Sequence, residues 1–303
     1  MTPPMLHIIT GPTATGKTAQ ALAWALEHDA EIVSCDSLLV YRGLDIGTAK
    51  PTPQERALVP HHCIDLVEPE TPYSVTEYIR DATDAIHGIL ARGKKVVVAG
   101  GSGFYLKAFF QAVTDTIPVP SPVIERVRAL QAEGLAALQA ALLPFAPERP
   151  ALLDWQNPRR VAKALERCLA SGKPLAEIHA AFLNTPPPFA AFARHTVLLE
   201  CEPEVLSARI ERRTRAMLDA GLVDEVRRLR SAGKLRPDTP AAVAVGYRET
   251  LAWLDAHDGT DTDGTDERAA LAASIATATR QLAAKQRKWF RTQIAVDEVR
   301  SQS

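Results

Sequence analysis

A short glycine-containing segment near the N-terminus constrains the fold more than any other feature of this sequence. It matches the pattern GxxxxGK[ST] and lies between an apolar run at 6–9 and a helix-forming stretch at 18–28. In that context, backbone N–H groups and a helix N-terminus bind a phosphate chain, the lysine adds a charge, and the last hydroxyl can bind Mg²⁺. The sequence therefore predicts a P-loop that binds a phosphorylated ligand. It consists of Gly11, Pro12, Thr13, Ala14, Thr15, Gly16, Lys17 and Thr18.

The pattern around this loop alternates between strand and helix. After the apolar run at 6–9, strands are expected at 31–35 and 94–99, and helices at 18–28 and 76–92. Such alternation is typical of an α/β fold with a doubly wound parallel sheet, whose ligands bind at the carboxyl ends of the strands. We therefore expect a P-loop NTPase-like core.

The pattern changes near residue 116, where Pro118, Pro120 and Pro122 interrupt the chain. The following seventy or so residues are helical in composition, and a strand pattern returns only at 196–200. We predict a helical insertion domain at 116–193 between two parts of one core, 1–115 and 194–303. Within the second part, 258–267 is expected to be a solvated acidic loop and 297–303 to fray.

Two further polar features are expected at the carboxyl edge of the sheet. Asp36 follows the strand at 31–35, and the glycine-rich turn at 100–103, which contains Ser102, follows the strand at 94–99. An acid at this position can bind Mg²⁺, bind a ribose, act as a base, or simply cap the turn that follows. The strand at 94–99 is followed by glycines, so it lacks the acid that a P-loop ATPase or GTPase would use at this position to hold Mg²⁺.

Charge and hydropathy restrict the possible partners. The net charge is −1, so a nucleic acid must be met by a local basic patch. No apolar run reaches the roughly 20 residues that span a bilayer, and no signal-peptide pattern precedes the first strand. We expect a cytoplasmic protein without a membrane partner, with reduced cysteines and a structural role for the cluster His61-His62-Cys63.

Basic residues gather in three places despite the balanced total. One group lies at 159–167 in the insertion, a second at 209–215, and a third at 280–291, where Trp289 and Phe290 interrupt it. Each group alone is more typical of a solvated helix face. Three such groups around one phosphate site indicate a polyanion larger than a nucleotide, because arginine and lysine contact phosphates and aromatic rings stack on unpaired bases.

Taken together, these motifs resemble the tRNA dimethylallyltransferase family along almost the whole chain. The stretch DIGTAKP is the most specific of them. The matching segments, in order, are GPTATGKT at 11–18, SCDS at 34–37, VYRGLDIGTAKP at 40–51, PHH at 60–62 with ID at 64–65, GGSGFY at 100–105, NPRR at 157–160, VGYR at 245–248 and TRQLA at 279–283.

The resemblance implies transfer of a dimethylallyl group from dimethylallyl pyrophosphate to N6 of the adenosine just 3′ of a tRNA anticodon, with Mg²⁺ as cofactor. The P-loop would then bind the leaving pyrophosphate and not ATP. The implied catalytic residues are Asp36, Ser102, Lys17 and Arg213, with Thr18 on the metal. The implied contacts to the anticodon stem-loop are Asp36, Ser37, Leu38, Leu39, Arg159, Arg160, Lys163, Gly246, Tyr247, Arg248, Lys285, Gln286 and Arg287.

Three positions depart from the family pattern. Ser102 stands where threonine is expected, Lys163 where arginine is expected, and Val243 where an arginine often precedes the VGYR segment. The hydroxyl and the charge survive at the first two, whereas the third loses a tRNA contact. The family reading also implies a monomer. Rival hypotheses are a P-loop small-molecule kinase, a non-catalytic RNA-binding module and prenyl transfer to free adenine nucleotides.

Overall fold

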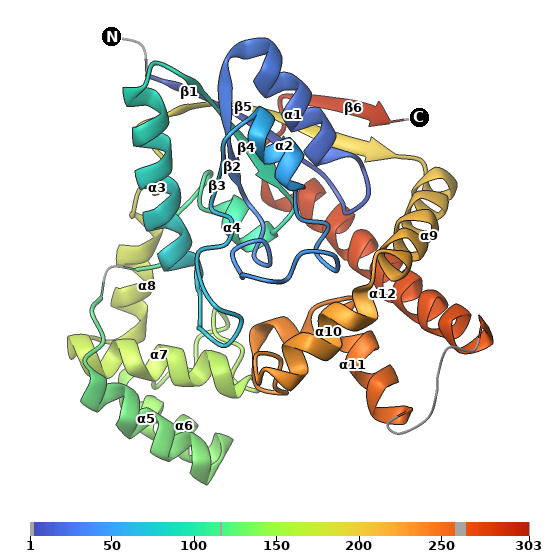
Figure 1. Cartoon of the computed structure of the whole chain (residues 1–303). Coiled ribbons are helices and arrows are strands. Elements are labelled where there is room, and N and C mark those ends of the chain that lie inside the picture. The colour runs from blue at the N-terminus through green and yellow to red at the C-terminus, as the bar shows by residue number, and fades with distance from the viewer. Residues whose placement is uncertain (1–2, 116, 258–264, 303) are drawn as a thin grey trace. The chain divides into compact units, whose positions relative to one another are not determined.

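The computed structural model describes residues 3–115, 117–257 and 265–302, and these form two compact units (Figure 1). Unit 1 comprises residues up to 111 and from 188 onward, and unit 2 comprises 112–187. The insertion limits expected from the sequence, 116 and 193, lie a few residues further along the chain.

Unit 1 is an α/β core. Its strands are β1 (Met5–Thr10), β2 (Ala30–Ser34), β3 (His61–His62), β4 (Lys95–Gly100), β5 (Ala193–Cys201) and β6 (Glu298–Gln302). Its helices are α1 (Lys17–His28), α2 (Pro53–Leu58), α3 (Val75–Ala91), α4 (Gly103–Lys107), α9 (Pro203–Asp219), α10 (Leu222–Ser231), α11 (Tyr247–Ala256) and α12 (Thr265–Gln293), with a 3₁₀ turn η2 (Pro240–Val243).

Within the described residues, the six strands form one parallel sheet in the order β3-β2-β4-β1-β5-β6. The chain moves outward from β1 to β2 and on to the edge strand β3, and then returns through α3 to β4. Because such crossovers are right-handed, α1 and α3 cover opposite faces of the sheet. On one face, Ala21 and Ala25 of α1 pack against Ile9, Val97 and Val197. The predicted α/β fold with a parallel sheet is confirmed.

The edge strand β6 corrects the expectation that the C-terminus frays. It pairs in parallel with β5, and Asp297 locks its start by accepting a hydrogen bond from the Thr196 amide at 2.8 Å. The strand sequence EVRSQ is mostly polar, so no hydrophobic pattern predicts a strand there. The predicted acidic loop falls mostly on 258–264, outside the described residues, and 265–267 already belong to α12.

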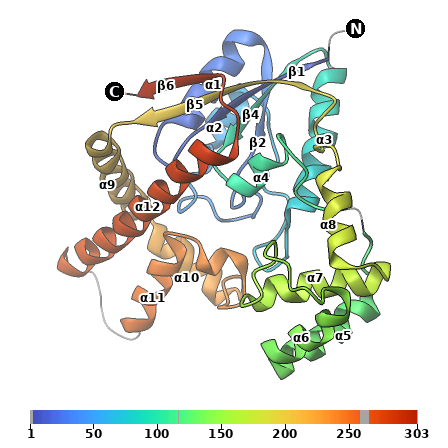
Figure 2. The same cartoon turned by 180° about the vertical axis from the view of Figure 1, so that it is seen from behind.

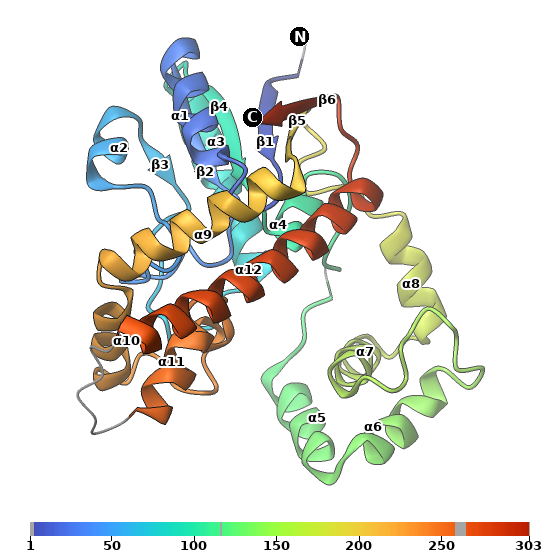
Figure 3. The ribbon, with the colours of Figure 1, turned by 90° about the vertical axis from the view of Figure 1, so that its right-hand side faces the viewer.

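The C-terminal helices form a second layer of unit 1. Helices α9 and α12 run side by side (Figure 3), and α12 also contacts α4 (Figure 2). A hydrophobic cluster joins the segment after β2 to α10, α11 and α12; its buried members include Tyr41, Leu44, Val226, Tyr247 and Leu271. Apolar side chains of the segment 38–50 therefore pack against the C-terminal helices.

Unit 2 is helical, with no strand among its described residues. Its core is formed by Leu138, Leu142, Val161, Leu165 and Ile178. The elements are α5 (Ser121–Glu133), α6 (Leu135–Leu142), a 3₁₀ turn η1 (Leu143–Phe145), α7 (Pro158–Ser171) and α8 (Leu175–Leu183).

Candidate active site

The P-loop connects β1 directly to α1. The Thr15 hydroxyl and the Lys17 ammonium both donate to the Pro12 carbonyl, at 2.9 and 2.7 Å, and hold the loop closed on itself. Helix α1 begins at Lys17, so its free N–H groups and the positive end of its dipole face the loop. This geometry is suited to a chain of phosphates.

Asp36 and Ser102 come together because β2 and β4 are neighbours in the sheet. The Cys35 amide donates to the Ala99 carbonyl at 2.8 Å, which places the two strand ends side by side. The Ser102 hydroxyl accepts a hydrogen bond from the Ser37 amide at 2.8 Å. The Asp36 carboxylate accepts one from the Leu38 amide at 2.9 Å through Oδ1. Asp36 therefore does cap the following turn, but the turn uses only one of its two oxygens.

Two cations lie near the Asp36 carboxylate. Burial lowers the pKa of Lys17 to about 8, while the charge of Asp36 opposes the shift and that of Arg213 adds to it. Burial also lowers the pKa of Arg213, against the same attraction of Asp36. Arg213 reaches the P-loop from α9, donating to the Thr13 hydroxyl at 3.4 Å and to the Thr48 carbonyl at 3.4 Å. One carboxylate and two cations thus converge on the P-loop.

Gln286 of α12 links the two glycine-rich loops, a contact that the sequence analysis did not predict. Its carbonyl oxygen accepts from the Thr13 amide at 2.8 Å, and its amide nitrogen donates to the Gly101 carbonyl at 2.9 Å. Gly101 lies tightly between the two loops, since a Cβ there would lie 3.0 Å from the Gly11 carbonyl oxygen and 3.4 Å from Lys17 Nζ. The glycine turn and the P-loop therefore form one cradle.

The other predicted tRNA residues of unit 1 divide into exposed and buried positions. Arg248 and Lys285 are exposed, and Ser37, Leu38 and Leu39 are half-buried beside Asp36. Arg287 donates to the Cys201 carbonyl at 2.9 Å.

Tyr247 and its neighbour Gly246 do not lie on the surface. Tyr247 is fully buried and donates its hydroxyl to Glu225 at 2.6 Å. Its ring therefore has no surface from which to contact RNA. We assign this ring to supporting the site, and we keep Arg248 as the predicted RNA contact of this segment. Val243, at the position where an arginine was expected, is 60% exposed.

In unit 2, the predicted basic residues lie at the start of α7. Asn157 caps this helix by accepting from the Arg160 amide at 3.2 Å, which places Arg159 and Arg160 in the first turn. Both arginines and Lys163 are exposed, and Lys163 also pairs with Glu166 at 2.6 Å. The first turn of α7 therefore offers two arginines to solvent.

Oxygen donors are the only metal ligands that this site can supply. No group of three or more His, Cys, Asp or Glu side chains within the described ranges could hold a metal ion. Thr18 is exposed at the start of α1 beside the cradle. An Mg²⁺ ion that keeps several waters and binds phosphate oxygens needs only one or two protein oxygens, so the Thr18 hydroxyl fits it.

The cluster His61-His62-Cys63 serves the edge of the sheet. His62 contacts Glu31 at 2.6 Å, His61 contacts the Val59 carbonyl at 2.7 Å, and Cys63 is a buried free thiol.

In the described part of the chain, no helix combines the length and hydropathy that crossing a membrane requires.

Comparisons with known proteins agree on one family. Residues 39–293 match the family model described as IPP transferase. The chain is 49% identical over 291 residues to the tRNA dimethylallyltransferase of Opitutus terrae (96% of this chain, 91% of the relative). It is 46% identical over 290 residues to that of Methylibium petroleiphilum (93% and 85%).

Solved structures give the same result. The full-length tRNA isopentenylpyrophosphate transferase of Bacillus halodurans superposes with a TM-score of 0.67 at 31% identity, covering 98% of this chain and 89% of that one. A eukaryotic dimethylallyltransferase acting on tRNA superposes with a TM-score of 0.81 at 25% identity, covering 97% and 74%.

Proposed function

The chain belongs to the IPP transferase family, and we propose that it transfers a dimethylallyl group from dimethylallyl pyrophosphate to N6 of the adenosine 3′ of a tRNA anticodon. The observation that carries this proposal is the single cradle formed by the P-loop and the Gly100–Gly103 turn, with Asp36 at its edge. The cradle suits a pyrophosphate, and the carboxylate suits an amine that must lose a proton.

In the proposed reaction, N6 of adenine attacks the allylic carbon, a C–N bond forms, and the C–O bond to pyrophosphate breaks. The N6 lone pair is delocalised into the ring, so N6 becomes a better nucleophile when a carboxylate accepts its proton. Asp36 takes this proton, and a positioned base of this kind contributes roughly 10²–10⁴-fold. The target base leaves its stack to reach the site.

Negative charge develops on the departing pyrophosphate as the C–O bond breaks. Lys17, Arg213 and the P-loop amides stabilise this charge in a partly buried site, where fixed donors act most strongly. Thr18 would hold Mg²⁺, which neutralises phosphate charge when bound. The Ser102 hydroxyl, which accepts from the Ser37 amide, holds the segment that follows Asp36.

The direct test is to incubate the protein with Mg²⁺, labelled dimethylallyl pyrophosphate and either tRNA or AMP, and to follow the label. We expect label in tRNA, at the adenosine beside the anticodon, and release of one pyrophosphate per transfer. Label in AMP alone would identify a free-nucleotide prenyltransferase. Phosphoryl transfer from ATP without prenyl transfer would identify a kinase.

Gln286 provides a test of the cradle. Replacing it by leucine removes both links between the loops, and each such hydrogen bond contributes about 0.5–1.5 kcal/mol. We expect kcat/KM for dimethylallyl pyrophosphate to fall by about tenfold with little change in tRNA affinity, because the leucine loosens the pyrophosphate site. Steady-state kinetics with varied prenyl donor measure this effect. A loss of tRNA affinity with unchanged donor kinetics would instead support the original assignment of Gln286 to tRNA.

The exposed arginines of α7 are proposed to contact phosphates of the anticodon stem-loop. Replacing Arg159 and Arg160 together by glutamine should weaken tRNA binding. A plot of the logarithm of the association constant against the logarithm of salt concentration should become less steep, its negative slope shrinking by about 1–2. Filter binding across a salt series measures the slope. The matched control replaces Arg126 and Arg128, two exposed arginines of α5 in the same unit, and should leave the slope unchanged. Equal effects of the two pairs would contradict a specific contact.

We also propose that the protein acts as a cytoplasmic monomer. All four cysteines are free and buried, as expected for a chain that folds in a reducing compartment.

A further inference from the structure

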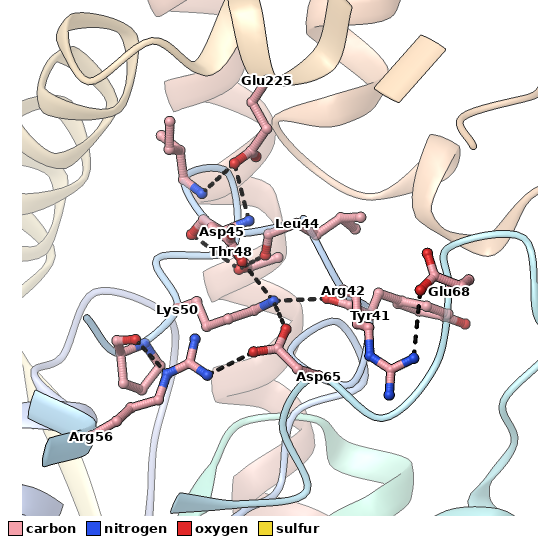
Figure 4. A network of polar contacts seen from close by, with 12 residues as sticks. Tyr41, Arg42, Leu44, Asp45, Thr48, Lys50, Arg56, Asp65, Glu68 and Glu225 are labelled. Carbon is pink, nitrogen blue, oxygen red and sulfur yellow. Dashed lines mark hydrogen bonds and ion pairs between the residues drawn. The ribbon is translucent and has the colours of Figure 1, made fainter. Parts of the chain in front are cut away.

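The DIGTAKP stretch has no role in the reaction described above, although it is the most specific motif of the sequence. The motif covers residues 45–51, and its first six residues together with Leu44 form a loop, 44–50 (Figure 4). The loop meets the reacting groups at one point, where the Thr48 carbonyl accepts from Arg213 Nη2 at 3.4 Å. The conformation of the loop therefore bears on the position of the Arg213 guanidinium.

A buried carboxylate holds this loop from α10. Glu225 is only 1% exposed, and both of its oxygens accept hydrogen bonds. Oε2 accepts from the amides of Asp45 and Ile46 at 3.1 and 2.8 Å (Figure 4), while Oε1 accepts from the Gly47 amide at 3.3 Å. A buried charge is stable only when its hydrogen bonds are made, so Glu225 and three successive amides fix one another.

The ring of Tyr247 supports the same loop. Tyr247 donates its hydroxyl to Glu225 Oε1 at 2.6 Å, and its ring packs directly against Gly47. A Cβ at Gly47 would lie 2.5 Å from the ring carbon Cε2, so only glycine fits there. This contact explains the glycine of the motif without any reference to a ligand.

The far end of the loop is tied by Lys50, whose side chain is 1% exposed. Its ammonium contacts the Asp45 and Asp65 carboxylates at 2.8 and 2.5 Å and donates to the Tyr41 carbonyl at 2.8 Å (Figure 4). All three donors of the ammonium are therefore used within the protein. Both ends of the loop are fixed, and the Thr48 carbonyl between them has a defined position.

We propose that Glu225 is a positioning residue, which places Arg213 for the reaction through the loop 44–50. The inference rests on the proposed function, because Arg213 acts there on the leaving pyrophosphate. A long arginine side chain has many rotamers, and a carbonyl at a fixed position selects the one that faces the P-loop. Such preorganisation lowers the barrier because no reorganisation is needed in the transition state.

The test is a double-mutant cycle of Glu225→Gln and Arg213→Gln, measured as single-turnover transfer to tRNA with excess enzyme. Glutamine keeps the shape of the side chain but replaces one acceptor by a donor, which opposes the loop amides. We expect Glu225→Gln to lower this rate about tenfold. The KM values for both substrates, measured separately in the steady state, should stay within about twofold, since the lost interaction acts in the transition state. In the Arg213→Gln background, the same change should alter the rate by less than about twofold.

The matched control is Glu31→Gln. Glu31 is also a buried carboxylate, 6% exposed and bound by Arg92 and His62, but it lies on β2 away from the loop. We expect this variant to lower the melting temperature and to leave the rate per folded molecule unchanged. A role of Glu225 in stability alone would make it behave as Glu31 does.

Several outcomes would overturn the proposal. These are an unchanged rate in Glu225→Gln, or effects of the two substitutions that multiply in the double variant. If Glu225→Gln does not fold, Tyr247→Phe replaces it in the same cycle, because it removes one hydroxyl and keeps the ring under Gly47. An inactive wild-type protein would instead refute the proposed function, so the two failures are distinguishable.

Discussion

Replacing Asp36 by asparagine should lower the rate of dimethylallyl transfer by roughly 10²–10⁴-fold and leave tRNA binding nearly intact. The amide has no basicity to accept the N6 proton. It does keep the Oδ1 acceptor that the Leu38 amide uses at 2.9 Å, so the turn after β2 should survive. The variant therefore separates the charge of Asp36 from its role as a cap.

The rate is measured by single-turnover transfer to tRNA, and the affinity by filter binding at the same salt concentration. Thermal unfolding of Asp36→Asn should match that of the parent. A rate within a few-fold of the parent would show that Asp36 is not the base. A comparable loss of tRNA affinity would show that it mainly binds the target adenosine.

Replacing Lys17 by glutamine should lower the rate by roughly 10²–10³-fold, the usual effect of removing one donor to a developing oxyanion. Lys17 carries the full positive charge of the P-loop and lies at the N-terminus of α1. Its ammonium donates to the Pro12 carbonyl at 2.7 Å, which leaves two of its three N–H groups for a phosphate. Pre-steady-state measurement of pyrophosphate release gives the size of the effect.

The pKa of Lys17 predicts a pH dependence as well. Burial lowers this pKa to about 8, so the free enzyme loses the Lys17 charge as the pH rises through that value. Because kcat/KM reports ionisations of the free enzyme, kcat/KM for dimethylallyl pyrophosphate should fall above about pH 8, and by about tenfold per unit well above it.

The matched variant for this profile is Lys17→Arg, whose guanidinium stays charged throughout the range. Its kcat/KM should be lower in absolute value but flat above pH 8. The same decline in both proteins would assign it to another group, and a flat parent profile would show that Lys17 stays charged in the free enzyme.

The parts of the site that could be predicted are those coded within a few neighbouring residues. The P-loop lies where its spacing puts it, between β1 and α1. Asp36 and Ser102 each follow a recognisable apolar strand, and parallel strands end at the same edge of a sheet. Their proximity therefore followed from pattern alone, whereas the edge strand β6, with its polar sequence, could not be predicted in this way.

Glu225 and Gln286 could not be predicted, for different reasons. Glu225 does leave a signal, because it lies on the apolar face of α10 with Leu222, Val226 and Leu229, where an unpaired acid is costly. This position indicates that the carboxylate has a hydrogen-bonding partner, but it does not identify that partner. Gln286 lies on a basic, partly aromatic stretch of α12, and this composition concealed the link that its amide makes to the P-loop.

The sequence by itself determined the P-loop motif, the parallel sheet and the family, because each depends on local backbone geometry or on ordered motifs. The tertiary structure decided which side chains join the two halves of the cradle and hold the neighbouring loop 44–50. Gln286 is 273 residues from Thr13, and Glu225 is 178 residues from Gly47. Contacts across such distances depend on how α10 and α12 pack against the core, and no local pattern specifies that packing. The P-loop was therefore evident from eight residues, whereas the contacts that hold it and the loop 44–50 in place were not.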